Sequence, residues 1–131
     1  MLDLTLSRRA VAAGWKWQKG ATAVGFGVVS YHRPADEWSP ERVCTADNEH
    51  VNDWENTENM LPDFNDAATR GVLIQQVRER WDDPWLCVAW TGVIWICVDR
   101  HGIGLVPPCR GDSETAALVA ALEAAPKEKA L

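Results

Sequence analysis

Several features that identify common protein classes are missing from this sequence of 131 residues. Its first residues, MLDLTLSRR, lack the apolar run after a basic region that a secretory signal peptide requires. The longest apolar run, 86–98, is interrupted by Thr91 and Gly92 and is too short for a membrane-spanning helix. We therefore expect a cytoplasmic protein that has no contact with a membrane.

Cysteine is scarce, and its spacing forms no familiar motif. The chain has four cysteines and no CxxC pair: Cys44, Cys87, Cys97 and Cys109. Structural zinc sites place their ligands in close pairs, whereas here Cys44 with His50 and Cys97 with His101 are the nearest approximations. We expect reduced thiols, no metal and no other cofactor. A small metal-binding protein stays an alternative hypothesis.

Motifs for catalysis and phosphate binding are absent as well. The sequence has no GxxxxGK[ST] loop. Cys109, His101 and Asp99 do have the residue types of a nucleophile, a base and an orienting acid. No signature of a cysteine enzyme surrounds Cys109, and a single turn rarely aligns three catalytic groups. We expect packing roles for these residues, with a small cysteine- and histidine-dependent enzyme as the alternative.

Tryptophan, in contrast, is abundant. Eight tryptophans stand against one tyrosine and two phenylalanines. Hydrophobic residues make up 47% of the chain and charged residues 24%, which is typical of a globular protein. We expect indole rings to fill much of the core, with an acceptor for each buried indole N–H.

The pattern of apolar residues predicts a single α+β domain over 1–131, in which about three helices pack on an antiparallel sheet of about four to five strands. The helices are expected at 4–13, from a cap at Asn65 or Asp66 to about 81, and from a cap at Asp112 or Ser113 to about 125. Strands are expected at 15–17, 22–31, 85–90 and 93–98, and two short stretches, 42–45 and 103–106, are further candidates. The last five residues, 127–131, are expected to fray.

The two apolar runs at 85–90 and 93–98 predict a hairpin. Thr91 and Gly92 would form its turn, so that Trp90 pairs with Val93. Both faces of this hairpin are apolar. We therefore expect it to be covered on both sides or used at an interface.

Two segments resemble a group of small phage and prophage proteins. LPDFNDAATRGVLIQQVRERWDDP, 61–84, has the PD-x-x-D-x-A-T helix start of that group, and GDSETAALVAALEAAP, 111–126, has its terminal A-L-V-A-A-L-E-A-A-P helix. This chain has Ala67 where the group often has proline. The resemblance implies a phage or prophage setting in the cytoplasm of a host cell. It implies no activity, substrate or catalytic residue.

The middle of the chain, 33–66, holds most of the negative charge, and we call it the acidic segment. It contains ten acidic and two basic residues, which gives a net charge of −8, against −6 for the whole chain. We expect a loop-rich insertion here. Direct binding of nucleic acid is not expected at a pI near 5.0.

The leading hypothesis is a phage or prophage accessory protein that binds a basic host or phage protein, in the manner of a counter-defence or host-takeover inhibitor. Clustered acids accelerate encounter with a basic partner, and indoles are favoured interface anchors. A solvated loop explains the same charge equally well, and a minor virion or assembly protein is a further alternative. The expected partner-binding residues are Asp36, Glu37, Trp38, Glu41, Asp47, Glu49, Asp53, Trp54, Glu55 and Glu58.

Overall fold

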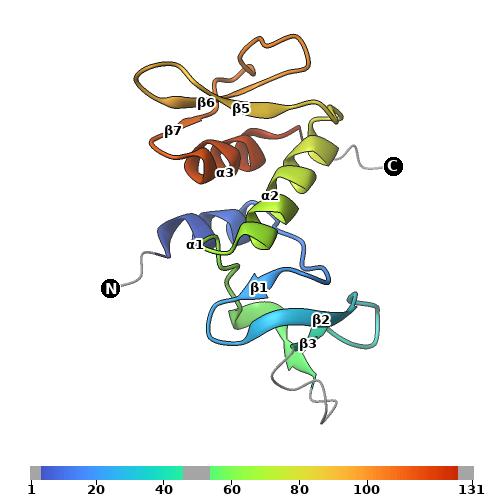
Figure 1. Ribbon diagram of the computed structural model, residues 1–131. Coiled ribbons are helices and arrows are strands. Elements are labelled where there is room, and N and C mark those ends of the chain that lie inside the picture. Colours follow the sequence, from blue (N-terminus) through green and yellow to red (C-terminus); the bar gives the residue numbers. More distant parts are fainter. Residues whose placement is uncertain (1–3, 46–53, 127–131) are drawn as a thin grey trace. The chain divides into compact units, whose positions relative to one another are not determined.

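The computed structural model describes residues 4–45 and 54–126, which belong to two compact units. Residues 1–15 and 73–131 form the first, which we call the hairpin unit, and 16–72 form the second, the acidic unit. The described residues form three α-helices and two antiparallel sheets, so the predicted α+β class is confirmed (Figure 1). The strands are divided between a four-stranded and a three-stranded sheet, one in each unit.

The hairpin unit is built around α3, Glu114–Ala124. Ser113 caps this helix as predicted, because its Oγ accepts a hydrogen bond from the backbone N–H of Ala116 at 3.0 Å. The helix packs against α1, Thr5–Ala12, and lies under the three-stranded sheet (Figure 1). Its buried residues are Ala116, Ala117, Leu118, Val119, Ala121 and Leu122.

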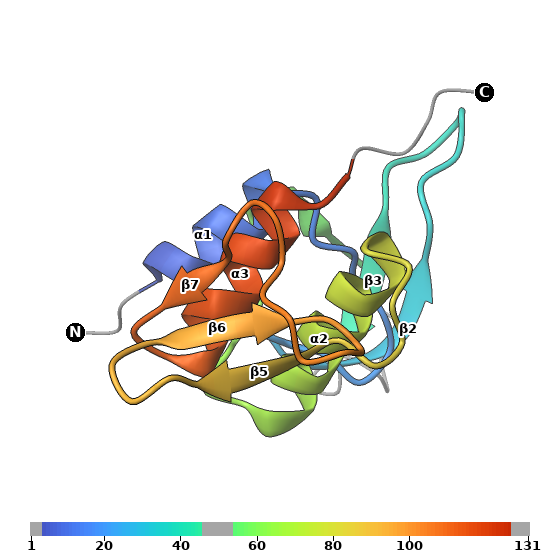
Figure 2. The same cartoon turned by 90° about the horizontal axis from the view of Figure 1, so that it is seen from above.

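Three strands form the sheet above α3 (Figure 2). β5, Cys87–Trp90, and β6, Trp95–Val98, form the predicted hairpin, and β7, Arg110–Gly111, pairs with the other edge of β6. The strand expected at 103–106 is reduced to an isolated bridge between Gly104 and Val98.

The register of the hairpin differs from the prediction by two residues. Trp90 pairs with Trp95 instead of Val93, because the turn contains four residues and not two. The Thr91 side chain closes this longer turn: its Oγ1 accepts from the backbone N–H of Ile94 at 3.1 Å. Because side chains alternate with a period of two, a shift of two residues leaves the same residues together on each face of the hairpin.

The two faces of this sheet have different neighbours. Cys97 faces α3, where its thiol donates a hydrogen bond to a helix carbonyl at 3.3 Å. Gly111 faces α3 as well, and a Cβ added there would lie 2.4 Å from the Cβ of Ala116. Ile96 and Arg110 pair across β6 and β7 and lie on the opposite face. A side chain at position 111 is therefore excluded by the helix.

We predict that Gly111→Ala lowers the free energy of unfolding by about 1–3 kcal/mol, because the new methyl group overlaps α3. Gly104→Ala is the matched control, since the Cβ position at 104 has no atom within 4 Å. The control should change stability by less than about 0.5 kcal/mol. Urea denaturation followed by circular dichroism measures both values, and equal losses would contradict the packing described here.

Helix α2, Ala67–Arg80, begins in the acidic unit and ends in the hairpin unit. Of the two predicted caps, Asn65 and Asp66, it is Asp66 that caps its start. The Asp66 carboxylate accepts from the Thr69 backbone N–H at 3.0 Å, the Thr69 hydroxyl at 2.8 Å and the Thr22 hydroxyl at 3.2 Å. These bonds, those from Thr69 above all, stabilise the charged form and lower the pKa of Asp66.

Asp66 therefore contributes a pH-dependent part of the stability. Its contribution is complete above the unfolded pKa of about 4 and is lost as the pH falls through the lower folded pKa. We predict that Asp66→Ala lowers the free energy of unfolding by about 1 kcal/mol at neutral pH. Asp66→Asn keeps the cap but cannot titrate. The stability difference between wild type and Asp66→Asn should shrink from about pH 5 to about pH 2, and a difference independent of pH would argue against this role.

Near its other end, α2 is tied to the rest of the hairpin unit. The Arg80 guanidinium donates to the carbonyls of Ala13 and Gly14 after α1. Trp81, the next residue, donates its indole N–H to the Ala121 carbonyl of α3 at 2.9 Å. These bonds occupy carbonyls and an indole donor that would otherwise lack partners.

The acidic unit contains a sheet in the order β1-β2-β3-β4. Its strands are Thr22–Ala23, Gly27–Arg33, Arg42–Thr45 and Glu55–Asn56, and the 3-10 turn Thr57–Asn59 follows them. The strand predicted at 42–45 is confirmed. The strand predicted at 22–31 is two strands, because Gly25 and Gly27 take positive φ values and reverse the chain between them.

Tryptophan does not fill the core. Of the eight indoles, only Trp15 and Trp17 are buried, whereas Trp38, Trp85 and Trp90 are more than half exposed. Aliphatic residues take their place, and the largest side chains with less than 2% exposure are Met60, Leu73, Leu86 and Leu122. The expectation of an indole-rich core is wrong. The predicted strand at 15–17 is wrong too, since this segment joins neither sheet.

None of the helices within the described ranges is long and apolar enough to cross a membrane.

Candidate functional site

Asp36 shapes a turn that holds Glu37 and Trp38 in solvent. Its Oδ1 accepts from the backbone N–H of Trp38 at 2.8 Å and from that of Ser39 at 2.7 Å. These bonds, that of Trp38 first, lower the pKa of Asp36. Trp38 is 87% exposed. Glu37 is exposed too and has no hydrogen bond or ion pair among the described residues. The turn therefore presents an indole and a carboxylate together.

Glu41 has a structural role in the same unit. Its carboxylate lies 2.7 Å from Nε2 of His32 and accepts from the Thr57 hydroxyl, also at 2.7 Å. The Glu41 side chain is only 30% exposed. It therefore connects β2 to the 3-10 turn, and its two oxygens are already engaged.

Trp54 is also engaged within the unit. The Arg33 guanidinium lies over its ring, 4.7 Å from the centroid, which is a cation–π contact. Trp54 is half-buried, so it pins the chain just before β4. Glu55 follows it in β4 and has an interaction within the protein, whereas Glu58 in the 3-10 turn is exposed and has none among the described residues.

The predicted partner-binding residues thus fall into three groups. Asp47, Glu49 and Asp53 lie outside the described residues. Four make contacts within the unit: Asp36, Glu41, Trp54 and Glu55. Three project exposed side chains: Glu37, Trp38 and Glu58. The acidic unit contains ten acids and five bases, so it carries −5 of the chain's net charge of −6.

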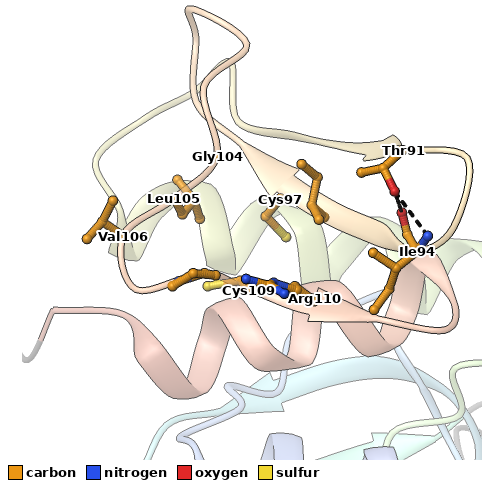
Figure 3. A pocket seen from close by; sticks show the side chains of 10 residues that line it. Thr91, Ile94, Cys97, Gly104, Leu105, Val106, Cys109 and Arg110 are labelled. Atoms are coloured by element: carbon orange, nitrogen blue, oxygen red, sulfur yellow. Dashed lines mark hydrogen bonds between the residues drawn. The ribbon is translucent and has the colours of Figure 1, made fainter.

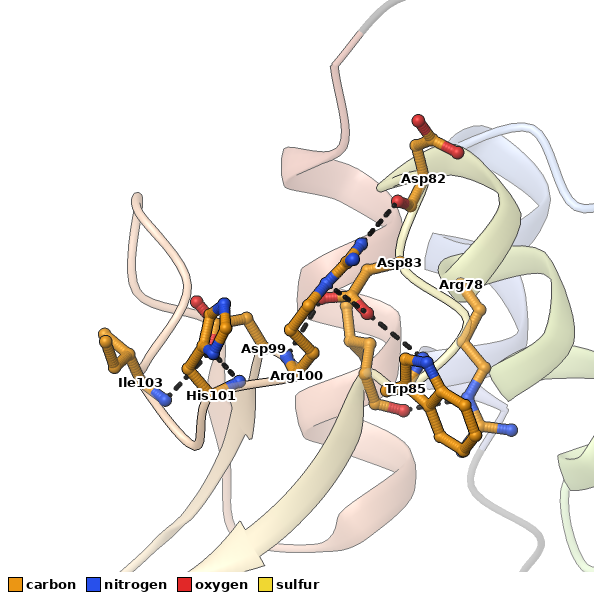
Figure 4. Close-up of polar contacts among 9 residues, drawn as sticks. Arg78, Asp82, Asp83, Trp85, Asp99, Arg100, His101 and Ile103 are labelled. Atoms are coloured by element: carbon orange, nitrogen blue, oxygen red, sulfur yellow. Dashed lines mark hydrogen bonds and ion pairs between the residues drawn. The ribbon is translucent and has the colours of Figure 1, made fainter.

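The predicted catalytic residues make contacts that serve the fold. The Asp99 carboxylate accepts from the backbone N–H groups of His101 at 2.8 Å and Ile103 at 3.1 Å (Figure 4). These bonds, that of Ile103 first, lower the pKa of Asp99. The Cys109 thiol is buried, donates to the Pro107 carbonyl at 3.3 Å, and has a pKa raised by burial. A raised pKa disfavours the thiolate that a nucleophilic cysteine needs.

Asp83 organises the polar groups next to this turn (Figure 4). Its carboxylate accepts from the backbone N–H groups of Trp85 and Arg100, both at 3.0 Å. The Arg100 Nε lies 3.7 Å from the same carboxylate, and Arg78 donates to the Leu86 carbonyl at 2.8 Å. The polar groups at this end of the hairpin therefore fix the ends of its strands.

No group of three or more histidine, cysteine, aspartate or glutamate side chains in ranges 4–45 and 54–126 could hold a metal ion. All four cysteines are free thiols; Cys44, Cys97 and Cys109 are buried and Cys87 is exposed. Burial raises the pKa of Cys97 to about 12, and its neighbours Cys109 and Cys87 add to the shift.

We predict that Cys87 is the one fast-reacting thiol of the native protein, because the other three are buried. Titration with dithionitrobenzoate at about pH 8 should release one equivalent quickly, and Cys87→Ser should abolish this phase. All four thiols should react after unfolding in guanidinium chloride. A fast phase that persists in Cys87→Ser and disappears in Cys109→Ser would instead support the cysteine-enzyme alternative.

A pocket of about 470 Å³ lies in the hairpin unit, beside β6 (Figure 3). Its aliphatic walls include Ile94 and Ile96 from the hairpin and Leu105 and Val106 from the connection to β7. Arg110 of β7 completes it. The volume is within the range of small-molecule sites. In the sequence, only the apolar character of both hairpin faces pointed to a binding region here.

Exposed apolar side chains gather in the same unit. Trp85, Trp90, Val93, Ile103 and Val106 are each more than half exposed, and all belong to the hairpin or its connections. The chain therefore presents two candidate binding regions, the Trp38 turn and the pocket beside β6.

In comparisons with known proteins, no family model, no curated protein and no solved structure matches the chain.

Proposed function

We propose that this protein acts by binding a basic protein partner through the turn 36–39 and the exposed Glu58 of the same unit. Trp38 carries this proposal: it is 87% exposed in a turn that Asp36 holds with three hydrogen bonds. An exposed indole on an ordered turn loses little conformational entropy on binding, and tryptophan is enriched among the residues that dominate interface energies. The turn thus suits an interface anchor.

The charge of the acidic unit supports a basic partner. Its net charge is −5, and the Glu37 and Glu58 carboxylates have no partner among the described residues. Such charges attract a basic surface over a Debye length of about 8 Å at physiological salt and raise the rate of encounter. Burial of the Trp38 ring would then supply most of the affinity.

We prefer binding to catalysis because the candidate catalytic residues make hydrogen bonds that stabilise the fold. Asp99 bonds to backbone N–H groups, and Cys109 is buried with a raised pKa. The resemblance of 61–84 and 111–126 to phage proteins supports a phage or prophage setting for this binding protein, with inhibition of a host protein as its proposed use.

The test uses three immobilised proteins as bait in lysate of a bacterial host. They are the wild type, a site variant with Glu37→Gln, Trp38→Ala and Glu58→Gln, and a control with Glu79→Gln, Trp85→Ala and Glu114→Gln. Each variant loses two negative charges and one exposed indole, but the control loses them from the hairpin unit. Captured proteins are identified by mass spectrometry, purified and titrated by calorimetry.

We expect the site variant to bind the purified partner about tenfold more weakly or worse, and the control to bind like the wild type. Binding of the wild type should weaken markedly between about 50 and about 500 mM NaCl, because exposed charges are screened. A partner that binds the site variant and the wild type equally, or whose affinity does not depend on salt, would refute the proposal.

A further inference from the structure

The pocket beside β6 has a buried apolar interior and an exposed rim (Figure 3). Leu105 is only 8% exposed and Cys97 is fully buried, whereas Val106 is 85% exposed. Cys97 and Cys109 also belong to the lining, although the Cys97 thiol itself faces α3, and burial raises the pKa of both thiols. The interior therefore suits an aliphatic group.

Arg110 is the only charged side chain among the described residues that line this pocket. It pairs with Ile96 across β6 and β7, so both side chains are on the face of the sheet directed away from α3. Arg9 pairs with Glu123 and Arg80 donates to carbonyls, but the Arg110 side chain has no hydrogen bond or ion pair among the described residues. The Arg110 guanidinium beside this apolar cavity is therefore available to bind an anion.

We propose that this pocket binds an organic carboxylate with an aliphatic tail. The tail lies between Ile96 and Leu105, and the carboxylate accepts two hydrogen bonds from the Arg110 guanidinium. The planar guanidinium matches the two oxygens of a carboxylate, which is why arginine is favoured for such contacts. The pocket volume of about 470 Å³ accommodates one such small molecule, with the exposed Val106 covering its outer side.

The length and the head group of the ligand provide separate tests. Calorimetry or amide chemical shifts are followed during titration with butanoate, hexanoate, octanoate and decanoate, and with octanol and octylamine. Affinity should rise about threefold to fourfold per added carbon until the pocket is full, because each methylene leaves water. Octanol should bind about tenfold more weakly than octanoate, and octylamine more weakly still, because they lack the negative charge.

Three variants locate the site. Arg110→Gln should reduce the affinity for octanoate to that for octanol and leave octanol binding unchanged. Gly104→Leu adds a side chain at a lining position where the Cβ has no neighbour within 4 Å, so it should fill the pocket and abolish binding of both ligands. Arg8→Gln is the matched control, since it removes one exposed arginine of the same unit that does not line the pocket.

Circular dichroism confirms that each variant is folded. If Gly104→Leu does not fold, Val106→Glu replaces it, because this exposed rim position would then repel the carboxylate. The proposal is overturned if octanoate does not bind, if octanol binds as tightly, or if Arg110→Gln or the pocket variant binds octanoate like the wild type. These outcomes are independent of partner binding at Trp38, which belongs to the other unit.

Discussion

The hairpin unit depends on the close approach of β7 to α3 at Gly111. A Cβ at this position would lie 2.4 Å from the Cβ of Ala116 and 2.6 Å from a backbone nitrogen of the helix, so only glycine fits. The contact holds β7 against the helix and sets the orientation of the strand. Because side chains alternate along a strand, a glycine that faces the helix directs Arg110 to the other face. The packing of the core thus decides where the one arginine of the pocket is placed.

The described carboxylates include some that accept hydrogen bonds within turns and others that are exposed and available to bind a partner. Asp36, Asp66 and Asp99 each accept hydrogen bonds from backbone N–H groups two to four residues ahead. Hydrogen bonds lower the pKa of each carboxylate, and at Asp66 the bond from the Thr69 hydroxyl contributes most. Glu37 and Glu58 have no such bonds among the described residues. The acids of one dense run therefore do not all contribute to a binding surface, since some of them already accept hydrogen bonds within the protein.

Local chemistry made the helix caps at Asp66 and Ser113 predictable, because a short polar side chain before an apolar periodic run has one strong use. The hairpin register was not predictable from turn propensity alone, since the Thr91 side chain adds a hydrogen bond that favours a longer turn. The split at Gly25 and Gly27 was missed because apolar alternation continues across it. The pocket was not predictable from the sequence, because part of its wall is the irregular connection between β6 and β7, which has no periodic pattern. The prediction of an indole-rich core failed because the hydrophobicity of a residue does not tell whether its position is buried or exposed.

The division of the chain falls between Val72 and Leu73, in the middle of α2. The acidic unit holds residues 67–72 of this helix and the hairpin unit holds 73–80, and each piece is far shorter than the roughly 12–15 residues at which an isolated helix becomes marginal in water. Neither unit contains the whole of α2. A fragment that ended at this point would carry too few residues of α2 to keep them helical by themselves.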